Sequence, residues 1–213
     1  MDSKYEPRWP AVLALFTIGG LYAALPANLI IGPRWLPFLV ALGFNIPMFF
    51  LKNQGRHGHN QILSYILLGI LTGFMLVSLT LLVFSLPRHQ EAPVVLLRSA
   101  VLLWVTNILL FASWYWRLDA GGPHRREARF EHLDGAFLFP PMMLEKGVKE
   151  RLGLIAWSPL FVDYLYLSFN TSAAFSTTDT TPISRWAKVL MIIQAGVSLA
   201  IISLLAARSV NIL

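Results

Sequence analysis

Two histidines could bind a metal ion. His57 and His59 stand one residue apart within a polar stretch, residues 52–60. Imidazole is a common metal ligand, so the pair could contribute to a zinc or other transition-metal site. The stretch contains no aspartate or glutamate, and the chain contains no cysteine to complete a ligand set. We therefore expect residues 52–60 to form a solvated loop, with no metal and no cofactor bound.

Carboxylates and serines could act as catalytic groups, but no catalytic motif positions them. The sequence has no H-E-x-x-H, G-x-S-x-G, P-loop or dinucleotide-binding fingerprint. Acid–base chemistry would have to use loop carboxylates that no motif distinguishes from one another. The absence of cysteine also excludes thiolate catalysis and disulfides. We predict that the chain is not an enzyme.

The elements that carry these residues belong in a membrane. Of the 213 residues, 56% are hydrophobic and 13% are charged, whereas soluble domains have about 45–50% and 25%. The net charge is +6, but the basic residues flank apolar runs. Lipid headgroups are therefore the expected partner, and nucleic acid is not. The sequence predicts an all-α, multi-pass protein of the cell membrane.

Four apolar runs precede residue 118, at residues 10–31, 35–51, 62–86 and 94–116. They predict a region of four transmembrane helices over residues 1–117. The aromatic cluster Trp114-Tyr115-Trp116 predicts an anchor at the headgroup level. A polar connecting loop follows over residues 118–157. Within it, the apolar residues 137–144 either lie on the membrane surface or form one buried patch of a solvated loop.

The last quarter of the chain reads as a short helix, a polar strand and a long helix. Ser158 and Pro159 are typical of a helix start, which predicts a short helix over residues 160–173. Ser184 is placed to cap a final helix over residues 186–207. Between them lies a stretch rich in hydroxyl groups. This order predicts a re-entrant segment, since irregular backbone at membrane depth is tolerated only where protein or water satisfies it.

Residues 158–213 resemble the pore domain of tetrameric potassium channels, which carry a pattern like F-D-A-L-Y-F-S-F-V-T-L-T-T-V-G-Y-G-D-x-x-P. The matching stretch runs from Phe161 to Pro182 without gaps. Lys188 falls where the inner helix has an arginine, and Ser198 where many channels have a hinge glycine. The segment is also similar to a group of bacterial multi-pass membrane proteins of uncharacterised function with the same degenerate ending. The resemblance implies a channel-like pore unit over residues 158–213, a homotetramer, and a bacterial inner membrane.

The filter of the family is degenerate in this chain. Ser176 and Thr178 stand at the two glycine positions, Thr177 replaces the tyrosine and Ala174 replaces the innermost threonine. Threonine is strained at the positive φ that such a carbonyl ladder requires, so a potassium-type filter is not expected. The resemblance implies a pore mouth, a pore helix and an inner helix, whose candidate residues are Ala174, Phe175, Ser176, Thr177, Thr178 and Asp179, then Asp163 and Asn170, then Gln194, Ser198 and Ser203.

A second topology stays open. If residues 152–175 cross the membrane completely, the chain has six spanning helices and the basic loop lies on the same side as both ends. That arrangement satisfies the preference of Lys and Arg for the cytoplasmic side. We expect a channel-like protein that conducts monovalent cations without potassium selectivity. The alternative is a non-conducting scaffold or partner-binding subunit of the same ancestry.

Overall fold

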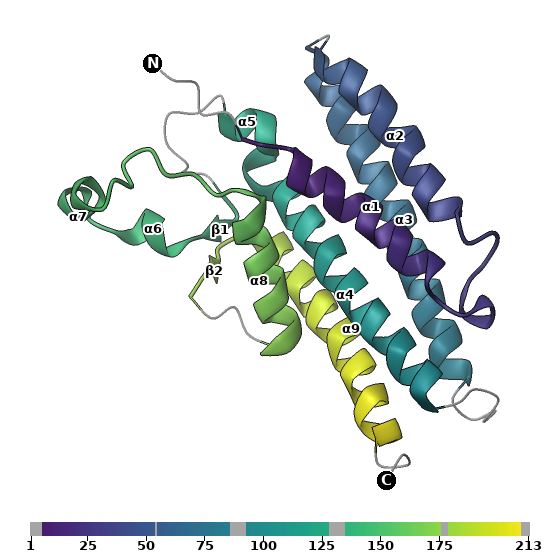
Figure 1. Cartoon of the computed structure of the whole chain (residues 1–213). Helices are drawn as coiled ribbons and strands as arrows, with labels where there is room; N and C mark the ends of the chain where they lie inside the picture. Colours follow the sequence, from purple (N-terminus) through teal and green to yellow (C-terminus); the bar gives the residue numbers. More distant parts are fainter. Residues whose placement is uncertain (1–5, 54, 86–92, 128–134, 176–178, 210–213) are drawn as a thin grey trace.

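The computed structural model describes residues 6–53, 55–85, 93–127, 135–175 and 179–209. The described chain is mostly helical (Figure 1). Its longer helices are α1 Trp9–Ala23, α2 Leu36–Asn53, α3 His57–Ser85, α4 Pro93–Leu118, α8 Phe161–Ala173 and α9 Arg185–Ser209. Its shorter elements are η1 Ala27–Leu29, η2 Asp119–Gly121, α5 Pro123–Glu127, β1 Phe137–Leu138, α6 Pro140–Met143, α7 Lys146–Arg151 and β2 Thr181–Pro182.

Among the described residues, three helices are long and apolar enough to cross a membrane, namely α3, α4 and α9. Helices α1 and α2 are also apolar, but their apolar stretches are shorter. Helix α1 ends at Ala23 because Pro26 and the short η1 turn follow, so the apolar run 10–31 is not one helix. Pro47 lies inside α2. Because proline has no backbone N–H, the helix loses one hydrogen bond there. The membrane character expected from the sequence is therefore carried by fewer long helices than predicted.

Helix α4 is the centre of the bundle, in contact with α1, α3, α8 and α9 (Figure 1). Its middle is mostly apolar, and Leu103, Leu110, Phe111 and Ala112 are almost fully buried. A helix that is hydrophobic over most of its surface is expected to be enclosed by others. We call the end of the bundle where α4 finishes and α9 begins the loop end. Helix α4 contributes residues to each of the polar sites described below.

Helices α1 to α4 alternate in direction along the chain. Helices α1 and α3 begin at the loop end: Arg8, next to α1, pairs with Glu127 beyond α4, and Asn60 in the first turn of α3 lies near Arg117. Helix α2 returns to the same end, where Met48 accepts a hydrogen bond from Asn60 at 2.6 Å. Helix α9 runs away from it, so the described chain begins and finishes at opposite ends (Figure 1).

Helix α8 penetrates only part of the bundle. It starts at the loop end, where the ring of Phe161 lies 5.9 Å from the ring of Trp116. Its 13 residues span about 20 Å, less than a hydrocarbon core of about 30 Å. Residues 152–160 are not helical, so no continuous helix covers residues 152–175. Ser158 makes no cap, and the helix begins at Phe161, slightly later than the sequence predicted.

The chain returns to the loop end directly after α8. Strand β2 pairs antiparallel with β1, with Phe137 opposite Pro182. The backbone N–H of Ile183 then donates to the carbonyl of Ala136 at 2.8 Å. Ser184 caps α9 as the sequence predicted, since its hydroxyl accepts a hydrogen bond from the N–H of Ala187 at 3.3 Å. Both connections of α8 therefore lie at one end of the bundle.

The burial of aromatic residues corrects one sequence expectation and bears on one pair of alternatives that the sequence left open. Tyr115 and Trp116 are 0% and 2% exposed, so this cluster belongs to the core and is no headgroup anchor. Phe137 is likewise fully buried, with its ring 5.1 Å from the ring of Tyr115 and 6.0 Å from the ring of Trp186. Phe139 is also buried, so the apolar residues 137–144 begin as a buried patch, one of the two alternatives that the sequence left open.

Candidate functional site

A cluster of five polar side chains lies where α8 ends inside the bundle. Its members are fully buried and come from α4, α8 and α9; we call them the polar cluster: Asn107, Ser168, Ser172, Gln194 and Ser198. In α8 and in α9 the contributing residues are four positions apart, which puts them on one face of each helix. These two faces meet α4 at Asn107.

Gln194 connects the three helices of the polar cluster. Its Nε2 donates to the hydroxyl oxygens of Ser168 and Ser172 at 2.7 and 2.8 Å. Its Oε1 accepts a hydrogen bond from the hydroxyl of Tyr115 on α4. Ser168 donates in turn to the carbonyl of Ile108 at 2.7 Å. These bonds fasten the inner part of α8 to both of its long neighbours.

Asn107 is the member of the polar cluster that α4 contributes, and its two side-chain polar atoms differ in their hydrogen bonding. Its Nδ2 donates to the hydroxyl of Ser198 at 2.7 Å, with longer contacts of 3.5 Å to the Ser172 hydroxyl and the Gln194 carbonyl. Its Oδ1 is buried and has no hydrogen-bond partner among the described residues. A buried acceptor without a partner costs about 1–3 kcal/mol. Such an atom at the inner end of α8 is suited to accept from a polar group or a water.

A second polar assembly holds the outer end of α8. We call it the buried ion-pair network. Arg126 on α5 binds Glu6 at 3.1 Å, with side chains only 2% and 5% exposed. Arg126 also donates to the carbonyls of Trp116 and Asp119, at 2.8 and 2.9 Å. The hydroxyl of Tyr164 on α8 donates to the Asp119 carboxylate at 2.6 Å. The start of the chain, the end of α4 and the first turns of α8 are thereby joined.

Asp163 and Asn170, the residues predicted for a pore helix, do lie on α8. Asp163 stands in its first turn, where Oδ2 accepts a hydrogen bond from the N–H of Leu160 at 2.7 Å. A carboxylate at this end also meets the favourable side of the helix dipole. Asn170 lies one turn before the end of α8, and its Nδ2 is buried without a hydrogen-bond partner in the described part of the chain. Neither side chain joins the polar cluster.

The residues predicted for a pore mouth follow α8. Ala174 and Phe175 are exposed, and Phe175 has a φ of 53°; a left-handed residue at this position commonly ends a helix. Ser176, Thr177 and Thr178 lie outside the described residues. Asp179 is exposed beside β2. Ala174 and Phe175 therefore lie at the inner end of α8, whereas Asp179 lies on the return to the loop end.

The inner-helix candidates separate into two groups on α9. Gln194 and Ser198 point into the chain and are bonded within the polar cluster. Ser203 is exposed on the outer side of α9. The motifs in the sequence did not identify Asn107, Ser168, Ser172 and Tyr115. A signal for them existed: two pairs of polar residues four positions apart, in α8 and in α9, need polar partners, and Asn107 is an amide within an apolar run.

His57 and His59 do not form a solvated loop. They lie in the first turn of α3, where His57 stacks on His124 with ring centroids 3.3 Å apart and His59 is exposed. Burial, together with the nearby charges of His57 and Arg8, lowers the pKa of His124 below its ordinary value. Among the described residues no group of three or more histidine, aspartate or glutamate side chains could hold a metal ion.

Comparison with models of protein families, with curated proteins and with solved structures finds no match to this chain.

Proposed function

We propose that this chain is a channel-like membrane protein in which α4, α8 and α9 correspond to the outer helix, the pore helix and the inner helix of a pore unit. The observation that carries the proposal is the course of α8. It enters from the loop end, stops beside Asn107, and the chain returns to the loop end at Ile183. A helix of 13 residues held at both ends by polar groups is a re-entrant element and does not cross the membrane.

The outward faces of α8 and α9 support assembly of several chains around an axis. On α9, Val189, Ile192 and Leu199 are at least half exposed, and on α8 so are Val162 and Tyr166. Copies of the chain packed through these faces would bring the inner ends of α8 together. Asp179, exposed on the return from α8, would concentrate cations at the mouth. Without the two filter glycines the pore would be non-selective.

One observation favours the alternative of a non-conducting partner-binding subunit. The side chains of Gln194 and Ser198 form hydrogen bonds within the chain, so these bonding groups do not face a pore. Between Val189 and Ala206, Ser203 is the one polar side chain among the exposed residues of α9. A pore lined by this face of α9 would contain few polar groups, so water would not readily fill it. That the chain has no catalytic activity and no cofactor stays a prediction.

The distribution of charge supports an orientation. Among the described residues, three basic residues lie away from the loop end, namely Arg34, Arg98 and Arg208. The basic residues at the loop end are more numerous: Arg8, Arg56, Arg117, Arg125, Arg126, Lys146, Lys149, Arg151, Arg185 and Lys188. Lys and Arg favour the cytoplasmic side. We therefore expect α8 to enter from the cytoplasm, which is opposite to the orientation in potassium channels.

The re-entrant course is tested by labelling introduced cysteines, since the chain has none of its own. Lys146→Cys on α7 and a cysteine appended after Leu213 are each treated with an impermeant thiol reagent in intact and in opened vesicles. We expect the two positions to react from opposite sides. Reaction of both positions from the same side means that the segment around α8 crosses the membrane, and the channel proposal is then wrong.

Conduction is tested by cation flux in liposomes that contain the purified protein. We expect the flux to fall in Asp179→Asn, because the carboxylate that attracts cations is lost. Glu150→Gln is the matched control, since Glu150 is an exposed acid of α7 at the same end of the bundle. Opposite-side labelling without any flux would favour the non-conducting subunit.

A further inference from the structure

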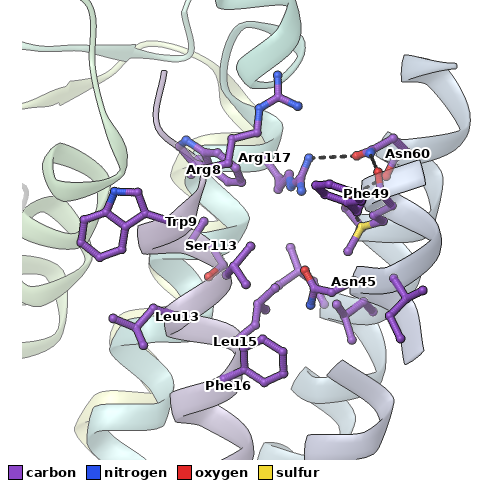
Figure 2. A pocket seen from close by; sticks show the side chains of 18 of the residues that line it. Arg8, Trp9, Leu13, Leu15, Phe16, Asn45, Phe49, Asn60, Ser113 and Arg117 are labelled. Atoms are coloured by element: carbon purple, nitrogen blue, oxygen red, sulfur yellow. Dashed lines mark hydrogen bonds between the residues drawn. The ribbon is translucent and has the colours of Figure 1, made fainter. Parts of the chain in front are cut away.

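An apolar cavity opens on the side of the bundle, between α1, α2, α3 and α4 (Figure 2). Its volume of about 780 Å³ falls within the usual range of small-molecule sites. Leu67 and Leu68 form part of its inner wall and are buried, whereas Leu13, Ile46 and Phe49 line it and are more than half exposed. The cavity is therefore open towards the outer surface of the bundle, which faces lipid when the bundle lies in a membrane.

A smaller basic pocket adjoins the cavity at the loop end. Its volume is about 190 Å³. Five of the residues that line it are arginine or histidine, and none is aspartate or glutamate: Arg8, Arg117, Arg125, His57 and His124. Arg8, Asn60 and Arg117 line both the cavity and the basic pocket. An apolar volume and a volume with only positive charge thus meet at one boundary.

Arg117 stands at this boundary, and no acidic side chain of the described residues forms an ion pair with it. Its guanidinium points across the cavity to Asn60, whose Oδ1 it reaches only at 3.4 Å (Figure 2). It also lies 4.6 Å from the centre of the Trp116 ring. A guanidinium has five N–H donors, so Arg117 retains most of its capacity to bind an anion.

The two neighbouring arginines differ from Arg117 in this respect. Arg126 is bound to Glu6 and Arg8 to Glu127, at 3.1 and 3.0 Å. A partly buried cation without a counter-charge is costly. Binding of an anion next to the Arg117 guanidinium would offset this cost and is therefore favourable. A phosphate group, which accepts several hydrogen bonds from a guanidinium, suits this position best.

A left-handed turn brings the remaining basic groups to the pocket. The φ values of Ala120, Gly121 and Gly122 are 50°, 78° and 92°. Two of the three residues are glycines, which adopt such angles without strain. The turn reverses the chain after α4 and directs α5 back towards α3. Arg125 then packs against Gly121, and His124 stacks on His57. The basic pocket is therefore built by the fold and is not a chance gathering of surface charge.

We propose that the cavity and the basic pocket together bind one anionic phospholipid, with its phosphate on Arg117 and Arg125 and an acyl chain in the apolar cavity. A soluble anion would leave the cavity empty. A zwitterionic lipid such as phosphatidylcholine would bring a quaternary ammonium group into a pocket lined by arginine and histidine. A two-part ligand of this kind satisfies both halves of the site. The proposal does not rest on conduction, because the site lies on the far side of α4 from α8 and α9.

The test is retention of lipid by the purified protein, measured by native mass spectrometry after exchange into phosphatidylglycerol or phosphatidylcholine. We expect the wild-type chain to retain phosphatidylglycerol in preference to phosphatidylcholine. Arg117→Gln and Arg125→Gln should each weaken that retention about tenfold, as expected for the loss of one charge-assisted contact. Arg125 is exposed, so its variant keeps the test valid if Arg117→Gln does not fold.

Arg98→Gln is the matched control, because Arg98 is an exposed arginine of the same helix α4 far from the site. Its retention of phosphatidylglycerol should equal that of the wild type. An equal loss in Arg98→Gln, or equal retention of zwitterionic phosphatidylcholine, would overturn the proposal. Inorganic phosphate is added as a competitor in a separate arm. If phosphate alone at millimolar concentration displaces the lipid completely, the site recognises a free anion and the proposal is wrong.

Discussion

Single polar side chains determine how the last quarter of the chain docks. Gln194 alone connects α9 with two serines of α8 and with Tyr115 of α4. In an apolar surrounding each of these groups needs its partner, since water cannot replace it. Interhelical hydrogen bonds in membrane proteins contribute only about 0.6 kcal/mol each on average. The cost of losing Gln194 therefore comes chiefly from the donors and acceptors that it would leave buried without partners.

We predict that Gln194→Leu lowers the thermal stability of the protein in detergent. The substitution keeps a similar volume but leaves the hydroxyls of Tyr115, Ser168 and Ser172 without a common partner. The Ser168 hydroxyl keeps its bond to the carbonyl of Ile108. The expected loss is therefore about 2–4 kcal/mol, from the Tyr115 and Ser172 hydroxyls at about 1–2 kcal/mol each. Ser203→Ala is the control, since Ser203 is exposed on the same helix and should melt like the wild type. Equal melting of the two variants would show that the polar cluster does not hold α8.

His124 gives the loop end a dependence on pH. Burial, followed by the charges of His57 and Arg8, lowers the pKa of His124 from 6.5. The unfolded chain therefore binds more protons than the folded one between the folded pKa and about 6.5. This contribution to stability is present above that window and is lost as the pH falls through it. We predict a lower melting temperature at pH 5 than at pH 7.5.

The variant His124→Gln identifies the source of that pH dependence. We expect the difference in melting temperature between pH 5 and pH 7.5 to become smaller in His124→Gln. His59→Gln is the control, because His59 is exposed and has no ring partner among the described residues. If His124→Gln leaves the pH dependence unchanged, the stacked histidines are not responsible for it.

At the scale of an element, the turn after α4 decides where α5 lies. Its three residues with positive φ reverse the chain within a few residues. The reversal brings Arg126 back to the carbonyls of Trp116 and Asp119 and to the carboxylate of Glu6. The buried ion-pair network and the basic pocket both depend on this one reversal. A change in the turn should therefore affect both.

We predict that Gly121→Ala destabilises the protein. An alanine at a φ of 78° is strained, and its Cβ would lie 2.5 Å from Cδ of Arg125. The strain contributes about 1–2 kcal/mol, and the side chain of Arg125 must move. Gly147→Ala is the matched control, since an added Cβ there meets nothing within 4 Å. Denaturant titration of both variants would measure the difference, and equal midpoints would contradict the assignment of strain.

The elements that could be predicted from the sequence are those with local signals. Helix α8 ends at Ala173 and α9 is capped by Ser184, both as the sequence indicated. The start of α8 differs because the N–H of Leu160 is satisfied by Asp163 in place of Ser158. The cluster Trp114-Tyr115-Trp116 was misread because an aromatic run has the same pattern in a core as at a headgroup boundary.

The candidate site depended on pairings between distant residues. Asn107 meets Ser198, 91 positions away, and Arg126 meets Glu6, 120 positions away. No local periodicity records which amide or carboxylate a given side chain will meet. Gln194 and Ser198 were identified as polar residues of α9, but the direction in which they point required the positions of α4 and α8. The apolar cavity was not predicted for the same reason.

For the whole molecule, the course of α8 fixes the relation between the two ends of the bundle. Because α8 begins and returns at the loop end, the long basic loop and the end of α9 lie on opposite sides (Figure 1). The apolar outward faces of α8 and α9 remain available for another copy of the chain. Any pore would then lie between chains and not within one.

We predict that any conductance of such an assembly discriminates little between potassium and sodium. Ser176 and Thr178 stand where a potassium filter needs glycine, so a ladder of inward carbonyls is strained. Bi-ionic recordings in planar bilayers would give the permeability ratio. A strong preference for potassium over sodium would contradict the argument, whereas a ratio near one agrees with it.

The amide of Asn107 has a consequence for biosynthesis. Its side-chain partner Ser198 on α9 is synthesised 91 residues later, so α4 must enter the membrane while this amide still lacks its final bonds. Helices α1 to α4 can assemble by contacts between successive helices. Helix α4 becomes enclosed only after α8 and α9 have been synthesised and pack against it. Chains that stop before α9 would keep a polar group exposed on α4 within the lipid. Such a group could mark incomplete chains for recognition by the machinery that removes unassembled membrane proteins.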